Sequence, residues 1–109
     1  MTTTQTQTIS WPGQSGKEYE YYIYRIGTNF KEAPGNYIFA KETTPNRYAP
    51  IYIGETCDLS TRFDNHHKMP CINRNGATHI HVHLSNANAD VRRMEEDDLI
   101  KKWSPPCND

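Results

Sequence analysis

The sequence predicts a small α+β domain in which a mostly antiparallel β-sheet is flanked by helices. Three observations support this class. Several segments of strand length are rich in tyrosine, isoleucine and valine, which favour strands. Clusters of proline, glycine and asparagine separate these segments, and two later segments carry helical signals. The 109 residues suit a single domain with a modest core.

The N-terminus is expected to be a flexible tail over residues 1–16. Residues 1–8 lack the basic start and the apolar centre of a secretory signal, and residues 11–16 are rich in turn-forming types. The folded domain is therefore expected over residues 17–109.

The first three strands are expected over residues 19–26, 36–41 and 50–54. The pair Pro34-Gly35 marks a turn before the second strand, and residues 43–46 form a loop before the third. The second and third strands are expected to form a hairpin. Pro50 belongs at the start of its strand or on an edge, because proline cannot donate a ladder hydrogen bond.

The second half of the chain is expected to hold a helix, a strand and another helix. Asp58 suits the N-cap of a helix that runs to about residue 68, with Leu59 and Phe63 on its buried side. Residues 78–84 alternate in the manner of a half-buried strand. A last helix is expected over residues 89–103, ended by Pro105 and Pro106.

The charge balance places a condition on nucleic-acid binding. The net charge is -1, the pI is about 6.5 and the mean hydropathy is -0.89, and no apolar run approaches the ~20 residues that span a bilayer. A chain of this charge binds DNA if its basic residues gather on one face or if a partner helps. The candidates for such a face are Lys41, Arg47, Arg62, Lys68, Arg74, Arg92, Arg93, Lys101 and Lys102.

The three cysteines, Cys57, Cys71 and Cys107, form an odd set without a CxxC pair. This count favours reduced thiols and a cytoplasmic location. Their spacing gives little support to a structural zinc site.

Two pairs of side chains are candidates for chemistry at a phosphate. Arg62 and His66 are four residues apart and would share one face of the expected helix, where a guanidinium could grip a phosphate and an imidazole could move a proton. A solvated polar face is the alternative. Tyr37 and Tyr52 lie on neighbouring strands and could face one cleft, although most strand tyrosines pack. His67 is expected on the surface.

The last helix carries four consecutive acids, and Glu96 is the one expected to project from its apolar face. With roughly 100° per residue, Glu96 shares that face with Leu99, Ile100 and Trp103. A buried carboxylate needs a metal or a partner charge. An ion pair with Arg92 or Arg93 is therefore the alternative to a metal site.

Three alternating histidines, His79, His81 and His83, share one face of the strand at residues 78–84. Such a face is usually polar and exposed, and it is expected to be so here. A metal site is the alternative reading.

Taken in order, Gly35-Asn36-Tyr37, Tyr52-Ile53-Gly54, Arg62, His66, Glu96 and Asn108 resemble the motif set of the GIY-YIG nucleases. This family includes homing endonucleases, certain restriction enzymes and the incision subunit of bacterial nucleotide-excision repair. Asn36 departs from the aliphatic residue usual at its position. By strand alternation it should point away from the face of Tyr37.

The resemblance implies a DNA endonuclease that hydrolyses phosphodiester bonds with one divalent cation. Glu96 would hold Mg²⁺ or Mn²⁺ with waters in the other positions, and Arg62 and Lys68 would contact the substrate. Tyr37 or Tyr52 would activate water, with His66 assisting. Gly54 would allow close backbone approach and belong to the substrate-binding residues. Asn108 would belong to the catalytic set, hydrogen-bonding within the site and tying the C-terminus to the sheet.

The resemblance also implies the partners of the chain. The substrate would be double-stranded or branched DNA in repair or restriction, without a membrane, and a second copy or a protein partner would supply specificity. RNA is a weaker candidate because no RNA-binding signature is visible. The alternative function is a catalytically inactive GIY-YIG-fold module that binds nucleic acid or protein.

Overall fold

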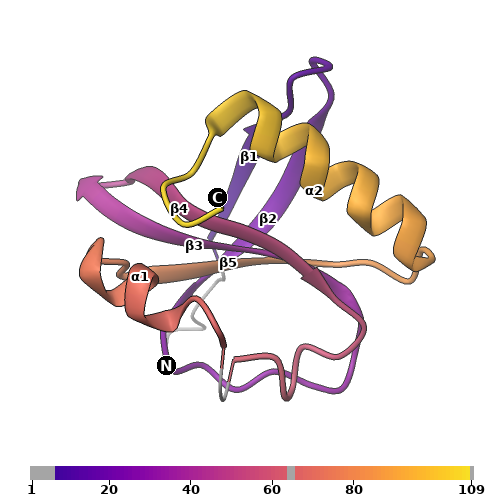
Figure 1. The fold of residues 1–109 in the computed structure, drawn as a ribbon, viewed down its shortest axis with the longest axis horizontal. Coiled ribbons are helices and arrows are strands. Elements are labelled where there is room, and N and C mark those ends of the chain that lie inside the picture. The colour runs from indigo at the N-terminus through magenta and orange to yellow at the C-terminus, as the bar shows by residue number, and fades with distance from the viewer. Residues whose placement is uncertain (1–6, 64–65, 109) are drawn as a thin grey trace, which may run out of the picture.

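A five-stranded antiparallel sheet with the strand order β1-β2-β5-β3-β4 forms the centre of the molecule (Figure 1). The computed structural model describes residues 7–63 and 66–108. Its elements are β1 (Thr8–Pro12), β2 (Glu18–Arg25), β3 (Gly35–Thr44), β4 (Arg47–Thr56), α1 (Met69–Arg74), β5 (His79–Leu84) and α2 (Ala89–Trp103). The expected α+β class is confirmed.

The β3–β4 hairpin is confirmed, and both of its strands are longer than the sequence suggests. Its turn places Asn46 in the left-handed region, with φ of 66°, which asparagine tolerates well. β4 is an edge strand, as the proline at position 50 requires. A register shift after Phe39 accommodates that proline, because Phe39 pairs with Tyr52 and Ala40 pairs with Pro50.

The expected tail over residues 1–16 is wrong for residues 8–12. These residues form β1, which pairs with β2 along its whole length. The reason is Trp11, a buried side chain whose ring lies 5.7 Å from that of His81 and 5.2 Å from that of Trp103. Residues 1–6 lie outside the described part of the chain.

The expected helix over residues 58–68 is also wrong for the described residues of that range. Residues 59–63 form turns, and the Asp58 carboxylate accepts hydrogen bonds from the main-chain N–H and the hydroxyl of Ser60. Such local bonds compete with a helix. Leu59 still packs in the core and the partly buried Phe63 packs against it, as expected, although the segment is not helical. Residues 64–65 lie outside the described part, and α1 begins at Met69.

The sheet has a core on each face, and the two helices lie on opposite sides of it (Figure 1). On the side of α1 the core consists of Tyr37, Phe39, Ile51, Tyr52, Leu59, Ile72, Ile80, Val82 and Cys107. On the side of α2 it consists of Trp11, Tyr21, Ile38, Ala40, Ile53 and Leu99. Alternation along β3 and β4 assigns neighbouring residues to different cores.

Helix α2 has the predicted bounds. Asn88 caps its N-terminus by accepting a hydrogen bond from the N–H of Val91 at 3.0 Å. Ser104, in the left-handed conformation, and the following prolines end it.

The expectation of reduced thiols is wrong for two of the three cysteines. Cys71 and Cys107 form a disulfide that joins α1 to the C-terminal segment, whereas Cys57 is free and exposed. Sequence spacing missed the pair because 36 residues separate its members. Since disulfides persist mainly in oxidising compartments, the cysteine count no longer supports the expected cytoplasmic location.

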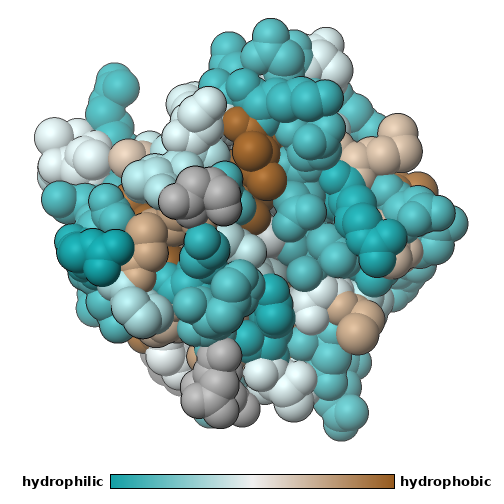
Figure 2. Space-filling model, viewed as in Figure 1, coloured by the Kyte–Doolittle hydropathy of each residue, from teal (hydrophilic) through white to brown (hydrophobic). Residues whose placement is uncertain are grey.

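The surface seen in Figure 2 is mostly hydrophilic, and its hydrophobic atoms form small patches. Across residues 7–63 and 66–108, neither helix is long and apolar enough to cross a membrane.

Candidate active site

The hydroxyl of Tyr37 is the point on which the candidate site converges. The Nε of Arg62 donates a hydrogen bond to it at 3.0 Å, and the Nε2 of His66 lies 2.8 Å from it. Tyr37 is fully buried in β3, while the other two residues belong to the segment between β4 and α1. The sequence placed Arg62 and His66 together on a helix; the structure brings them together on a tyrosine instead.

The tautomer of His66 follows from its second contact. The main-chain N–H of Lys68 donates to the Nδ1 of His66 at 3.1 Å, so Nδ1 carries no hydrogen. Burial, followed by the charge of Arg62, lowers the pKa of His66 to about 4, and the ring is neutral at pH 7. The single proton of the neutral ring therefore sits on Nε2 and points at Tyr37.

The Tyr37 oxygen thus accepts two N–H hydrogen bonds, which leaves its own proton to donate, and a hydrogen bond with Tyr37 lowers the pKa of Tyr52. Burial raises the pKa of Tyr37 above its ordinary value, while the hydrogen bond and the charge of Arg62 lower it. Both N–H donors would stabilise the phenolate that forms on loss of that proton. The arrangement suits a tyrosine that gives up and takes back a proton at one fixed point.

Tyr52 joins the same group, as expected from the neighbouring strands. Its ring centroid lies 6.1 Å from that of Tyr37 and 4.9 Å from that of His66. Burial raises the pKa of Tyr52, and the charges of Arg62 and Lys68 oppose that rise. His67 is exposed, as expected, and stacks on His66 at 5.0 Å between ring centroids.

Glu95 occupies the central position that the helical wheel assigned to Glu96, and that part of the prediction is wrong. Glu95 is 8% exposed and accepts from the Tyr21 hydroxyl at 2.6 Å, with the Nδ1 of His83 2.9 Å away. The helix turns this carboxylate to β2 and β5, a direction that the pattern within α2 cannot reveal. Val91 and Met94 on the outer side of α2 are exposed.

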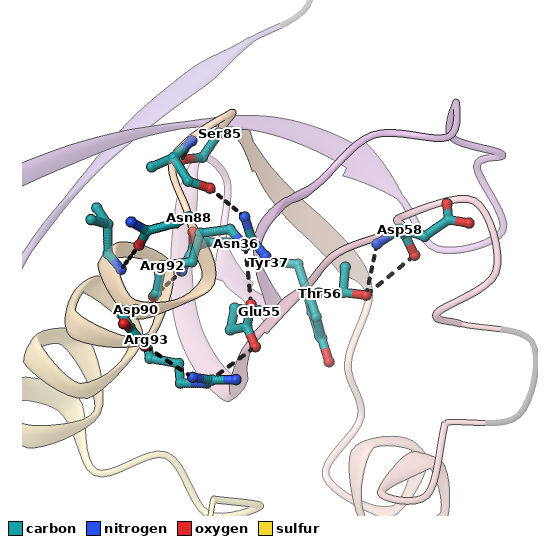
Figure 3. Close-up of polar contacts among 12 residues, drawn as sticks. Asn36, Tyr37, Glu55, Thr56, Asp58, Ser85, Asn88, Asp90, Arg92 and Arg93 are labelled. Atoms are coloured by element: carbon teal, nitrogen blue, oxygen red, sulfur yellow. Dashed lines mark hydrogen bonds and ion pairs between the residues drawn. The ribbon is translucent and has the colours of Figure 1, made fainter.

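Glu96 is partly buried and lies in the electrostatic field of the site. Burial, followed by the charge of Glu55, raises the pKa of Glu96 to about 7, while Arg62 and Arg93 lower it. The alternative ion pair with Arg92 or Arg93 is not formed. Arg92 instead pairs with Glu55 at 3.0 Å, and Arg93 lies 4.0 Å from the same carboxylate (Figure 3).

Glu55 is therefore a residue of the site that the sequence analysis missed. It pairs with Arg92 and lies 4.0 Å from Arg93, and Glu96 forms no hydrogen bond or ion pair with another residue of the described chain. The sequence could have pointed to Glu55, because it directly follows Tyr52-Ile53-Gly54 and shares the strand face of Ile53, which α2 covers. A carboxylate left unpaired near an arginine can accept a cation.

Within residues 7–63 and 66–108, no three side chains of the types His, Cys, Asp and Glu are grouped for metal binding. The expected site needs no such group, because Mg²⁺ commonly keeps several waters and takes one or two carboxylates. Glu96 has the hard oxygen donors that this ion prefers. The residues present therefore fit a hydrated Mg²⁺ or Mn²⁺.

The remaining predicted residues have structural contacts. Asn108 binds both main-chain polar groups of Ile53, accepting from its N–H at 2.7 Å and donating to its C=O at 2.8 Å. The predicted tie between the C-terminus and the sheet is thereby confirmed. Asn36 points toward α2 and Tyr37 away from it, as alternation predicts, and the Asn36 amide donates to the C=O of Arg92 at 2.8 Å (Figure 3).

The expected polar outer face of the histidine strand is wrong. His81 is fully buried and accepts a hydrogen bond from the indole N–H of Trp11 at 3.0 Å. His83 contacts Glu95 of α2 and keeps about a third of its side chain exposed. These histidines belong to the packing between the sheet, β1 and α2.

Comparison with known proteins adds no relative: no family model, no curated protein and no solved structure matches the chain. The resemblance to the GIY-YIG nucleases therefore stays a prediction from the motif residues. The geometry around Tyr37 is the independent observation that bears on it.

Proposed function

We propose that the chain is a metal-dependent DNA endonuclease of the GIY-YIG type. One observation carries the proposal: Arg62 and His66 converge on the hydroxyl of Tyr37, and Glu96, which has no ion-pair partner among the described residues, lies within range of the charge of Arg62. A cation, a phosphate-binding guanidinium and an acid–base group are the parts that phosphodiester hydrolysis needs.

Each residue has a distinct role in this proposal. Arg62 contacts Tyr37 through Nε and also has a hydrogen bond with Tyr52, and its remaining N–H groups would bind a phosphate. Tyr37 would first lose its proton to solvent and, as the phenolate, would take the proton of the attacking water while that water bonds to phosphorus and the bond to the leaving oxygen breaks. The leaving oxygen would take a proton from solvent, and the Nε2–H of His66 would hold the Tyr37 oxygen in place. A divalent cation on Glu96 would supply positive charge to stabilise the transition state. Lys68 and Gly54 would lie beside the substrate strand.

The raised pKa of Tyr37 sets a requirement for this role. A phenol whose pKa is raised by burial is almost never ionised at neutral pH, so it can act as a base only if positive charge beside it stabilises the phenolate. Arg62 supplies one such charge, and the cation on Glu96 would add a second. Activity should therefore depend strictly on the metal.

An inactive nucleic-acid-binding or protein-binding module is the second candidate. The net charge of -1 favours the protein-binding form of this candidate, because unaided binding to DNA draws on excess positive charge. A nucleic-acid-binding form differs from the nuclease in turnover, and a protein-binding form differs also in its ligand.

Cleavage of a supercoiled plasmid and of branched oligonucleotides, in Mg²⁺, in Mn²⁺ and in EDTA, tests the proposal. We expect nicking in either metal and none in EDTA. Glu96→Gln and Arg62→Ala should abolish nicking while the circular dichroism spectrum is unchanged. The matched controls are Asp97→Asn, the exposed neighbour that pairs with Lys101 at 2.9 Å, and Arg25→Ala, an exposed arginine of β2 that is not a candidate for the basic face. Nicking that survives in either site variant contradicts the mechanism.

A further inference from the structure

A hollow of about 350 Å³ lies on the sheet face that carries Tyr37, over β2 and β5. Rings from Tyr22, Tyr24 and Phe30 line it, and Asn29 and Lys31 add an amide and an ammonium at the loop that follows β2. The candidate active site uses none of these residues. The hollow is therefore a separate feature of the molecule.

The hollow presents apolar surface to solvent. Tyr22 is 43% exposed and Leu84, which also lines it, is 45% exposed. Ile26, at the adjoining depression that shares Thr28 and Phe30, is 40% exposed. Grouped exposure of this kind marks a binding surface more often than scattered single residues do.

A series of ring contacts joins the hollow to the candidate active site. Tyr24 contacts Phe30 at 5.2 Å between centroids, and Phe30 contacts Phe63 at 5.7 Å. Phe63 then contacts Tyr37 at 4.9 Å, and all three contacts are edge-to-face. The hollow thus lies within three ring contacts of the proposed base, on the same face of the sheet.

The lining matches one class of ligand. A nucleobase has a flat π-face for stacking and a polar edge for hydrogen bonds, and it carries a phosphate on its sugar. Exposed Tyr22 offers a ring, the amide of Asn29 both donates and accepts, and Lys31 offers a positive charge. A base inside a duplex keeps its faces covered by its neighbours, so the ligand must be unpaired.

We propose that this hollow binds an unpaired base of the substrate strand, so that the preferred substrate is DNA with a single-stranded arm or flap. The inference rests on the proposed nuclease function only in treating the bound strand as a substrate. Binding of an unpaired base needs neither the metal nor turnover. The two ideas can therefore fail separately.

Fluorescence of a short single strand that contains 2-aminopurine, titrated with protein in EDTA, tests the hollow without cleavage. We expect quenching on binding, and Tyr22→Ala should weaken the affinity about tenfold, within the usual effect of one stacked base. Tyr22→Phe should retain the affinity. Met94→Ala, a 71% exposed residue on α2, is the matched control and should change nothing.

Three outcomes overturn the inference. The first is an unchanged affinity in Tyr22→Ala. The second is an equal loss of affinity for blunt duplex and single strand, which would indicate a contact with the sugar-phosphate backbone that both share. The third is a change in sedimentation of Tyr22→Ala with no change in nucleotide binding, which would assign the hollow to a protein contact. Quenching by the wild type without nicking in Mn²⁺ would support the hollow and contradict the nuclease proposal.

Discussion

The ring of Tyr37 lies directly against the backbone of Gly54. The two residues face each other in the β3–β4 register, and a Cβ at position 54 would come within 2.5 Å of both Cζ and the hydroxyl oxygen of Tyr37. No real side chain fits at that distance. Glycine at position 54 therefore allows the phenol to reach Arg62 and His66, which connects two motifs of the sequence in one contact.

The substitution Gly54→Ala should displace Tyr37 and abolish nicking. We expect the free energy of unfolding to fall by about 1–3 kcal/mol, since the added methyl overpacks a filled site. Denaturant unfolding measures the stability, and the plasmid assay measures the activity. In the Tyr37→Ala background, the further change Gly54→Ala should lower the free energy of unfolding much less than it does in the wild-type background. If the loss in the double variant equals the sum of the losses in the two single variants, the contact is contradicted.

The stability of the protein should fall on acidification through His66. Its pKa of about 4 in the folded protein lies below the ordinary value of 6.5. The stabilisation is therefore complete above pH 6.5 and is lost as the pH falls from 6.5 to 4, where the unfolded chain binds the proton first. We expect about 1–3 kcal/mol from this residue.

The difference in unfolding free energy between the wild type and His66→Gln, measured from pH 7.5 to pH 4, isolates this contribution. His81, whose pKa is also lowered by burial, titrates in both proteins and cancels. This difference in unfolding free energy should become smaller as the pH falls. A difference that stays constant with pH would contradict a buried neutral imidazole at position 66.

Periodicity within a segment predicted most of the sheet and α2, because each of these elements carries its own alternation or caps. Long-range partners decide the elements that were missed. Residues 8–12 form a strand because Trp11 is covered by His81 and Trp103, which lie far along the chain. The spacing of Leu59 and Phe63 fitted a helix, but the Asp58 carboxylate accepts a hydrogen bond from the main-chain N–H of Ser60 and so favours a turn.

The site residues were predictable as a set, whereas their contacts were not. The order of the motif residues singled out Tyr37, Arg62 and His66, but only the fold shows that the tyrosine oxygen joins the other two. The choice between Glu95 and Glu96 depended on Tyr21 and His83, which belong to other strands. A helical wheel contains no information about those neighbours.

Metal binding at Glu96 should depend on pH. Its pKa of about 7 means that the proton competes with the cation below neutrality. The affinity for Mn²⁺ should rise about tenfold per pH unit up to pH 7 and level off above pH 8. Titration calorimetry from pH 5.5 to 8.5 measures this, with Asp97→Asn as the matched control. An affinity that does not change with pH would exclude this carboxyl as the ligand.

The amide of Asn108 should stabilise the edge of the sheet beside the site. It fills both free hydrogen-bonding groups of Ile53, which lies between Tyr52 and Gly54 on β4. We expect Asn108→Ala to lower the free energy of unfolding by about 1–2 kcal/mol. Exposed Asn73→Ala is the control and should change stability little. Faster hydrogen exchange at the Ile53 amide in Asn108→Ala would identify the cause, and unchanged exchange would contradict it.

The Cys71–Cys107 disulfide should hold the C-terminal segment on β4. It closes a loop over a separation of 36 residues that includes α2, and the N–H of Cys107 itself donates to the C=O of Ile51 at 3.0 Å. Restriction of the unfolded chain by a loop of this length contributes about 3–4 kcal/mol. We therefore expect dithiothreitol, or the double substitution Cys71→Ser and Cys107→Ser, to lower the melting temperature strongly.

The control is Cys57→Ser, which should melt as the wild type does and should respond equally to dithiothreitol. If dithiothreitol shifts the melting of the double serine variant as much as that of the wild type, the reductant acts elsewhere and this bond does not provide the stabilisation.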